Sequence, residues 1–128
     1  MRYLLDTHAF LWFLEGSNLL PKKVQNEIID HNNKCSLSVV SLWEIAIKLR
    51  IKKLTLKFPF ERLEEYLAET DIAVLPISFE HMVLLKGMDV HHKDPFDHII
   101  ISQGIIEDLT IITKDANFPN YTAKLFWK

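Results

Sequence analysis

The sequence predicts an α/β fold in three layers, α/β/α, with a central and mainly parallel β-sheet. Short apolar stretches typical of buried strands alternate along the chain with longer stretches of helical periodicity. This alternation predicts parallel strands joined by helices that cover both faces of the sheet. Ligands of such sheets bind beyond the carboxyl ends of the strands, where the strand order reverses. Functional side chains are therefore expected at the strand ends.

Five stretches have the length and composition of buried strands. Each is short and rich in β-branched or other large apolar residues. Pro76 marks the end of the third strand, because proline has no N–H to give to a sheet. The expected strands are Tyr3–Leu5, Cys35–Val40, Ile72–Leu75, Thr110–Thr113 and, as a candidate for the last, Lys124–Trp127.

Six stretches between these strands are expected to be helical. Pro21 suits a first helical turn, where its missing N–H is not needed. Leu63 and Leu67 lie one turn apart and predict an inward face, and Gly87 suits the end of a helix. The expected helices are Thr7–Leu14, Pro21–His31, Ser41–Ile51, Phe60–Thr70, Ser78–Lys86 and Asp94–Leu109.

The bulk composition predicts one folded domain, residues 1–128, in the cytoplasm. Hydrophobic residues make up 48% of the 128 residues, which argues against disorder. No apolar run reaches the ~18 residues of a membrane helix. Asp6 and His8 interrupt the first apolar stretch, which has no cleavage site after it and so is not a signal peptide. Cys35 is the only cysteine, which excludes an internal disulfide and predicts a buried, unreactive thiol.

The charge is distributed unevenly. The net charge of −2 counts against a general nucleic-acid binder. Residues 1–64 carry ten Lys and Arg and seven Asp and Glu (net +3), whereas residues 65–128 carry five and ten (net −5). No acid lies between Glu44 and Glu61, so that segment is a local basic stretch, or else a solvated helix end. Its basic residues are Lys48, Arg50, Lys52, Lys53 and Lys57.

Four acidic residues stand at or near the ends of the predicted strands. Asp6 directly follows the first strand, and Asp115 follows the fourth. Glu44 lies in the first turn of the helix after the second strand, and Asp97 lies in the first turn of the helix that begins at Asp94. Because the carboxyl ends of parallel strands share one edge, the four carboxylates converge if that last helix also begins there.

Local helix and turn chemistry offers a different explanation for each acid. Ser41 and Glu44 match the capping box S-x-x-E, and Asp94 suits an N-cap followed by Pro95. Asp6 could likewise cap the helix that follows it, and Asp115 could form an Asx-turn. Asp97 would be the third residue of its helix, where the helix dipole favours an acid. Capping alone does not require all four acids to share one edge, so their common position favours a functional site.

Converging carboxylates need a counter-charge. Four of them close together repel, so some are protonated or a cation neutralises them. Oxygen ligands without clustered Cys or His select Mg²⁺ or Mn²⁺ rather than Zn²⁺. Such an ion leaves positions for water and phosphate, and the pattern therefore predicts hydrolysis of phosphodiesters.

Four motifs carry a resemblance to a known family. In order they are LLDTH, SLWEIAIK, DPFDHIIISQ and ITKD, and together they extend over nearly the whole chain. They are similar to the motifs of PIN-domain ribonucleases, and more narrowly to those of VapC-type toxins of bacterial toxin–antitoxin pairs. The resemblance implies a PIN-like fold and a Mg²⁺-dependent or Mn²⁺-dependent endoribonuclease. It also implies an antitoxin that covers the site, and a homodimer.

The resemblance also implies roles for the acids. Asp6 and Asp97 match positions that ligate metal directly. Glu44 matches a position that binds metal or holds its water, and Asp115 matches one that acts directly or through water.

Four further residues are expected to support the site. Thr7 and Thr113 offer hydroxyl groups, and Asp94 is expected to cap a helix rather than to ligate metal. His98 stands where relatives carry Arg; it can still donate to phosphate, but with a charge that depends on pH. Lys48, Arg50, Lys52 and Lys53 are expected to attract the RNA backbone without reading sequence.

The other histidines and the tryptophans are assigned no catalytic role. The histidines expected at the surface or as caps are His8, His31, His81, His91 and His92, with His8 of most interest because of its place beside Asp6. Trp12, Trp43 and Trp127 are expected in the core or in an interface. The apolar run Phe10–Leu14 predicts burial in a dimer or under an antitoxin.

Two alternatives to the nuclease remain open on the sequence alone. The first is a phosphatase or phosphotransfer domain with Asp6 as nucleophile, although the second Asp usually found two residues later is missing. The second is a PIN-like domain retained only for binding. The sequence does not identify the RNA target, the cleavage position or the number of metal ions.

Overall fold

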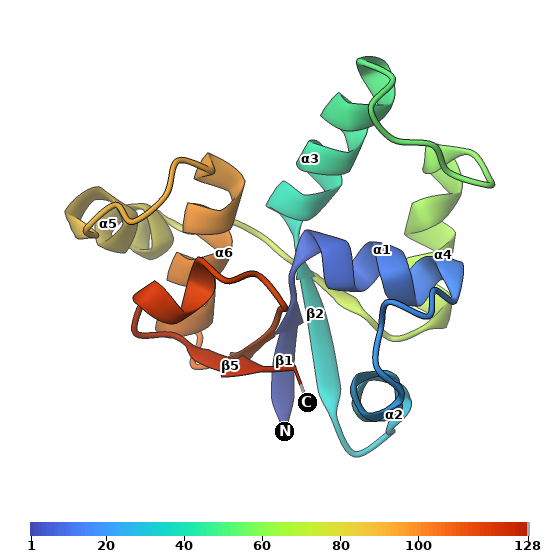
Figure 1. Cartoon of the computed structure of the whole chain (residues 1–128), viewed down its shortest axis with the longest axis horizontal. Coiled ribbons are helices and arrows are strands. Elements are labelled where there is room, and N and C mark those ends of the chain that lie inside the picture. Colours follow the sequence, from blue (N-terminus) through green and yellow to red (C-terminus); the bar gives the residue numbers. More distant parts are fainter. Residues whose placement is uncertain (128) are drawn as a thin grey trace.

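The fold is built on a five-stranded parallel sheet. The computed structural model describes residues 1–127, and the strand order is β3-β2-β1-β4-β5 with every neighbouring pair parallel (Figure 1). The strands are β1 (Arg2–Leu5), β2 (Lys34–Ser38), β3 (Ala73–Leu75), β4 (Thr110–Ile112) and β5 (Lys124–Phe126). The helices are α1 (Thr7–Glu15), α2 (Lys22–Ile29), α3 (Val39–Arg50), α4 (Leu63–Glu69), α5 (Phe79–Gly87) and α6 (Pro95–Ile106), with short 3₁₀ turns η1 (Phe60–Arg62) and η2 (Phe118–Asn120).

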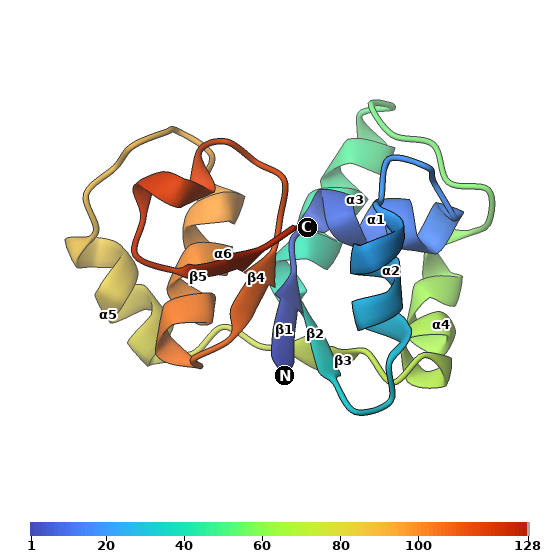
Figure 2. The ribbon, with the colours of Figure 1, turned by 60° about the horizontal axis from the view of Figure 1, so that its bottom comes forward.

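The predicted α/β/α layering is confirmed, and each expected strand and helix is present. Figure 2 shows α1, α2 and α4 on one side of the sheet, and α6 with α5 on the other. The boundary between β2 and α3 was predicted wrongly. The strand ends at Ser38, whose side chain accepts a hydrogen bond from the Val40 N–H and caps the helix that begins at Val39.

The central strand buries both of its faces, as expected for a parallel sheet between two helical layers. Alternate residues of β1 point to opposite sides. Tyr3 and Leu5 join the core beneath α1, α2 and α4, whereas Leu4 joins the core beneath α6. The apolar run in β1 therefore has no polar face, because neither of its faces is exposed to solvent.

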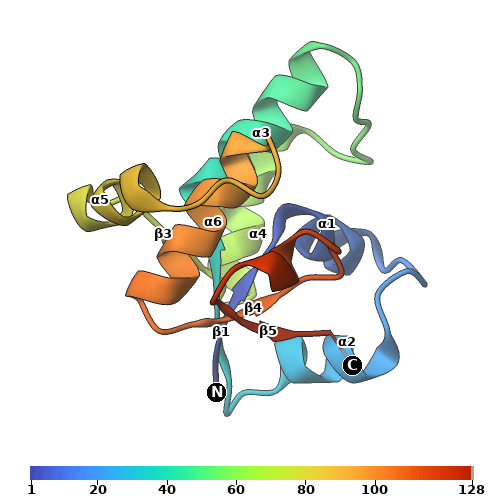
Figure 3. The same ribbon diagram turned by 60° about the vertical axis from the view of Figure 1, so that its left-hand side comes forward.

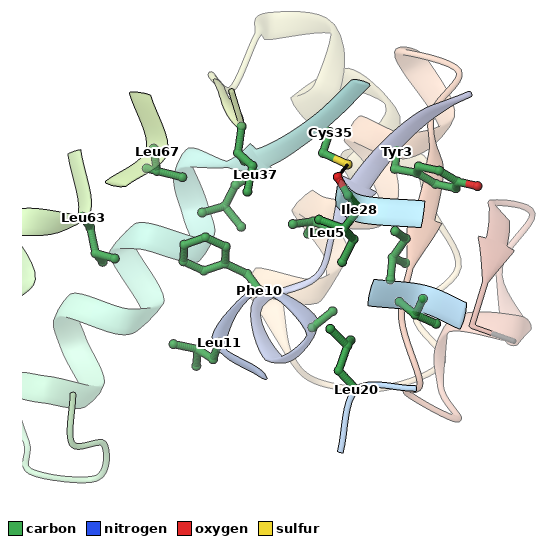
Figure 4. Packing of buried hydrophobic residues seen from close by; sticks show 14 of the residues in the cluster. Tyr3, Leu5, Phe10, Leu11, Leu20, Ile28, Cys35, Leu37, Leu63 and Leu67 are labelled. Carbon is green, nitrogen blue, oxygen red and sulfur yellow. Dashed lines mark hydrogen bonds between the residues drawn. The ribbon is translucent and has the colours of Figure 1, made fainter. Parts of the chain in front are cut away.

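Phe10 lies at the centre of the larger core. It is fully buried and is surrounded by side chains of α1, α4 and the strands (Figure 4). Cys35 lies in the same core, and burial raises the pKa of its thiol to about 11. The thiol is therefore buried and protonated at neutral pH, as the sequence predicted.

The order of the strands places three helix starts at one edge of the sheet. The chain moves outward from β1 through β2 to β3 and then returns to β4 on the other side of β1, so the strand order reverses between β1 and β4. Helices α1 and α3 follow directly from β1 and β2 at their carboxyl ends, and α6 packs against α3 (Figure 3). This is the edge at which parallel α/β sheets bind ligands.

Within residues 1–127, the structure has no helix that is both long and apolar enough to cross a membrane.

Truncating the central aromatic should test this core. Phe10→Ala is expected to lower the free energy of unfolding by about 3–5 kcal/mol, because the substitution leaves a cavity in a close-packed interior. Leu19→Ala, at a side chain that is 57% exposed, serves as the control and should change stability by no more than about 0.5 kcal/mol. Urea denaturation followed by circular dichroism measures both, and equal losses would contradict the assigned core.

Candidate active site

Asp6 is held at the carboxyl end of β1 by the start of α1. It is the N-cap of that helix, and its Oδ1 accepts a hydrogen bond of 2.7 Å from the Ala9 N–H. The residue is only 5% exposed. Burial raises the pKa of Asp6, while hydrogen bonds from Thr113 and from Ala9 oppose the rise. The capping explanation of Asp6 is therefore confirmed, but the cap is also a buried carboxylate that faces other acids.

Glu44 lies in the second turn of α3, because the helix begins earlier than predicted. The expected capping box between Ser41 and Glu44 is therefore wrong. Both carboxylate oxygens of Glu44 are occupied instead: Oε1 lies 2.8 Å from the Thr7 hydroxyl, and Oε2 lies 2.8 Å from Nζ of Lys48. The residue is 4% exposed, so this ion pair holds a largely buried carboxylate.

Thr7 connects α1 to α3. Its hydroxyl oxygen lies 2.8 Å from both the Glu44 carboxylate and the Ser41 hydroxyl. One hydroxyl has one hydrogen, which the carboxylate accepts, so Ser41 supplies the hydrogen of the other bond. The predicted supporting place of Thr7 matches this geometry, whereas Ser41 was expected only as a cap and is instead a buried part of the site.

Asp97 lies in the first turn of α6. Asp94 is the N-cap of that helix and accepts hydrogen bonds from the N–H groups of Phe96 and Asp97, as predicted, with Pro95 in the first turn. Burial raises the pKa of Asp97 to about 8, and the neighbouring carboxylates add to the rise. These neighbours, in decreasing order of effect, are Asp94, Asp115, Glu44 and Asp6.

Asp115 completes the group from the loop after β4. Its Oδ1 accepts a hydrogen bond of 2.8 Å from the Asn117 N–H, and its own N–H donates to the Thr113 hydroxyl at 3.0 Å. The Asx-turn explanation is thus correct for the local geometry. The structure nevertheless brings all four predicted acids to the same sheet edge, where each influences the charge of Asp97.

The acids face one another without forming a closed cage. Within the described part of the chain, no three His, Cys, Asp or Glu side chains are close enough to enclose a metal ion. One oxygen of Glu44 is paired with Lys48, and ionised carboxylates at this edge repel one another. The donor set is nevertheless all oxygen, and the neighbouring carboxylates add to the rise that burial causes in the pKa of Asp97. Both properties fit a hard divalent cation.

His92 contacts the site, although it was expected at the surface or as a cap; its side chain is only 10% exposed. Its Nε2 lies 3.1 Å from Oδ2 of Asp97, and its Nδ1 lies 2.9 Å from the hydroxyl of Tyr121. Its neighbour His98, expected to meet phosphate, uses its Nε2 to bind the backbone oxygen of His92 at 2.6 Å. The adjacency of His91 and His92 indicated only that they point apart; the partners of His92 are brought to it by the fold.

A small pocket adjoins the acids. It has a volume of about 260 Å³ and is lined by Asp6, His8, Trp12, Lys114 and Asp115. The Lys114 ammonium lies 5.6 Å from the centre of the Trp12 ring. A larger cavity of about 680 Å³ lies elsewhere, among apolar residues of α3, α4 and β3, and contains none of the four acids. The smaller pocket is the one that adjoins the candidate site, because Asp6 and Asp115 form part of its wall.

The remaining predicted residues divide into two groups. Lys48 is bound to Glu44, whereas Arg50, Lys52 and Lys53 are exposed at and beyond the end of α3. His81 was expected either at the surface or as a cap. It takes part in capping α5 and is only 1% exposed, so it is not a surface residue. Trp12 and Trp127 pack against the core, while Trp43 is 59% exposed.

The raised pKa of Asp97 predicts how stability depends on pH without metal. Protonated Asp97 favours the fold, so its contribution is fully present below about pH 4 and is lost as the pH rises to about 8. Asp97→Asn mimics the protonated form, so its melting temperature should increasingly exceed that of the wild type over this range. Melting curves in a chelator measure the difference, and a difference that did not change with pH would contradict the shift.

Comparison with known proteins agrees with this architecture. The PIN domain family matches residues 3–124. No curated protein matches the chain. Among solved structures, VapBC2 from Rickettsia felis bound to a promoter DNA fragment is 21% identical, with a TM-score of 0.69 over 98% of each chain. VapBC-1 from nontypeable Haemophilus influenzae is 16% identical, with a TM-score of 0.69 over 98% of this chain and 97% of that one.

A third structure has the same fold. VapBC-5 from Mycobacterium tuberculosis, a member of the VapBC family of toxin–antitoxin systems, is 18% identical, with a TM-score of 0.61 over 98% of this chain and 95% of that one. At these identities the structures establish a shared fold. The family match extends over nearly the whole chain and includes all four acids, and the chain therefore belongs to the PIN domain family.

Proposed function

We propose that the protein is a metal-dependent endoribonuclease and the toxin of a toxin–antitoxin pair. The observation that carries the proposal is the meeting of Asp6, Glu44, Asp97 and Asp115 at one sheet edge, where burial and then the neighbouring carboxylates raise the pKa of Asp97. The family assignment supports the nuclease, because PIN domains are generally nucleases. The VapBC structures of the same fold support the toxin role.

Each acid has a proposed role. Asp6 and Asp97 ligate Mg²⁺ or Mn²⁺ directly, Glu44 binds the ion or positions its water, and Asp115 acts directly or through water. When bound, such an ion stabilises negative charge on the phosphate and makes a bound water more acidic. Hydrogen bonds already orient the acids. Ala9 donates to Asp6, Thr7 to Glu44, His92 to Asp97 and Asn117 to Asp115. Within residues 1–127, the other oxygen of Asp97 and of Asp115 has no hydrogen-bond partner, whereas Asp6 is also bonded by the side chain of Thr113.

The basic residues beside the site are proposed to hold the RNA backbone. Arg50, Lys52 and Lys53 are exposed, and Lys114 lies in the wall of the small pocket next to Asp6 and Asp115. Cations at these positions offset the repulsion between an acidic site and a phosphate chain. This arrangement supports RNA binding by a protein whose net charge is −2.

An antitoxin partner and a homodimer are also proposed. The apolar run Phe10–Leu14 does not form a free surface for either partner, contrary to expectation. Phe10 and Leu11 are buried within the chain, and the other three residues pack against its core. Other surfaces support them instead. The cavity of about 680 Å³ between α3, α4 and β3 is mainly apolar, and Phe79, Met82 and Val83 of α5 are exposed.

The two alternatives make different predictions. The phosphatase would use Asp6 as its nucleophile, but position 8 holds His8 and not the second Asp that such enzymes usually carry. It would leave a trappable aspartyl-phosphate. The binding-only domain predicts that the acids hold a cation but do not cleave RNA. Saturable metal binding without turnover of any RNA would favour it.

Removing the proposed ligands tests the function directly. Asp6→Asn and Asp97→Asn are expected to reduce RNA cleavage to background while the far-ultraviolet circular dichroism spectrum stays unchanged. Saturable Mn²⁺ binding, followed by calorimetry, should be lost in Asp6→Asn. Asp89→Asn, at an exposed loop position, is the control and should cleave like the wild type. Full cleavage by either ligand variant would refute the site.

The role of the exposed basic residues should appear in the salt dependence of binding. Replacing Arg50, Lys52 and Lys53 by Ala in the inactive Asp6→Asn background is expected to reduce the slope of log affinity against log salt by about 2, since each contact to single-stranded RNA contributes roughly 0.7. Ala at the exposed Lys22, Lys34 and Lys86 is the matched control. Equal slopes for the two triple variants would rule out the assigned RNA path.

A further inference from the structure

A chain of hydrogen bonds joins Asp97 to a loop from a distant part of the sequence. His92 lies in the segment before α6, and Tyr121 follows η2. The His92 ring bridges them, with Nδ1 2.9 Å from the Tyr121 hydroxyl and Nε2 3.1 Å from Oδ2 of Asp97. This bridge links the α6 segment of the site to the loop after β4.

The partners fix which nitrogen of His92 carries the proton. The Tyr121 hydroxyl accepts a hydrogen bond from the His91 backbone N–H at 3.0 Å. Its own hydrogen is then free to be donated to Nδ1 of His92, so a neutral ring carries its hydrogen on Nε2. Nε2 therefore donates to the Asp97 carboxylate. Neither ring nitrogen is left free to act as a metal ligand.

Packing holds the ring in this orientation. The side chain of His92 is 10% exposed. Its ring centre lies 4.9 Å from that of His98, 5.6 Å from that of Tyr121 and 6.5 Å from that of Phe118. His98 also donates from its Nε2 to the backbone oxygen of His92 at 2.6 Å, which restrains the peptide as well as the ring. A side chain held from three sides can fix the direction of the group that it contacts.

We propose that His92 is a positioning residue, which holds one oxygen of Asp97 and so directs the other towards the cation of the site. The inference rests on the proposed function, since it assigns how one of the proposed ligands is oriented. Outer hydrogen bonds to ligating carboxylates and imidazoles are a general means of fixing ligand geometry in metal sites. Asp97 needs such a bond, because four carboxylates surround it and would otherwise push it away.

His91 provides a matched comparison within the same segment. It is the adjacent residue, of the same type, and its ring also packs on Tyr121, with 4.9 Å between ring centres. It is exposed, however, and only its backbone N–H contributes to the hydrogen-bonded chain. Replacing its side chain removes an imidazole from the loop and leaves every bond of the chain in place.

The experiment compares Mn²⁺ affinity by calorimetry in four purified variants. His92→Ala is expected to weaken binding by about ten- to a hundredfold, the usual effect of losing an outer partner of a ligand. His92→Gln keeps an N–H donor and should recover part of the loss. Tyr121→Phe removes the bond to Nδ1 and lets the His92 ring rotate, so its Mn²⁺ affinity should lie between those of the wild type and His92→Ala. His91→Ala should bind Mn²⁺ like the wild type.

A purely structural role of His92 predicts a different pattern. Melting temperature would then fall without a specific loss of Mn²⁺ affinity, and the Gln variant would recover no binding. In cleavage assays, mispositioning of Asp97 should lower kcat and leave KM for RNA unchanged. If His92→Ala does not fold, Tyr121→Phe decides the question, and wild-type affinity in that variant would overturn the proposal.

The outcomes separate this inference from the proposed function. Loss of binding in Asp97→Asn together with wild-type affinity in His92→Ala would overturn the role of His92 and leave the nuclease intact. Absence of Mn²⁺ binding in the wild type would overturn both. Weakened binding in His92→Ala with partial recovery in His92→Gln supports both.

Discussion

Repulsion among carboxylates is the constraint around which the rest of the structure is arranged. A parallel sheet brings the ends of β1 and β4 to the same edge, and the helices that follow add acids from α3 and α6. The chain answers this repulsion with a set of separate bonds, each to one oxygen. The donors are the Ala9 N–H, the Thr7 hydroxyl, the Lys48 ammonium, the His92 ring and the Asn117 N–H. They fix the acids without neutralising the group as a whole.

The negative charge that remains on these acids favours the binding of a cation. Burial, followed by the neighbouring carboxylates, raises the pKa of Asp97 to about 8, so a proton and a divalent cation would compete for this carboxylate near neutral pH. Metal binding at such a site releases protons and is therefore stronger at higher pH. Lys48 acts as a counter-ion for Glu44, 2.8 Å from its Oε2. Metal affinity and the ionisation of the acids are therefore linked, and both depend on pH.

The sequence was sufficient for the fold and for the identity of the four acids. Strands and helices followed from apolar periodicity, and the acids followed from their places at strand ends, which any parallel sheet brings together. The details that were missed depend on longer-range contacts. The start of α3 was misplaced because Val39 and Val40 favour strands, while the side chain of Ser38 caps a helix there. The role of His92 depends on Tyr121, which is 29 residues away in the sequence.

The pairing of β1 with β4 also determines when the site can form during synthesis. Tyr3 is in register with Thr110, so the central strand lacks one of its two neighbours until β4 has been made. Contacts so distant in sequence form slowly, because a long loop must close first. Asp115 comes from the loop that follows this late strand. A nascent chain that has not yet reached this loop therefore carries Asp6, Glu44 and Asp97 without Asp115, and the group of four acids is incomplete until residue 115 has been made.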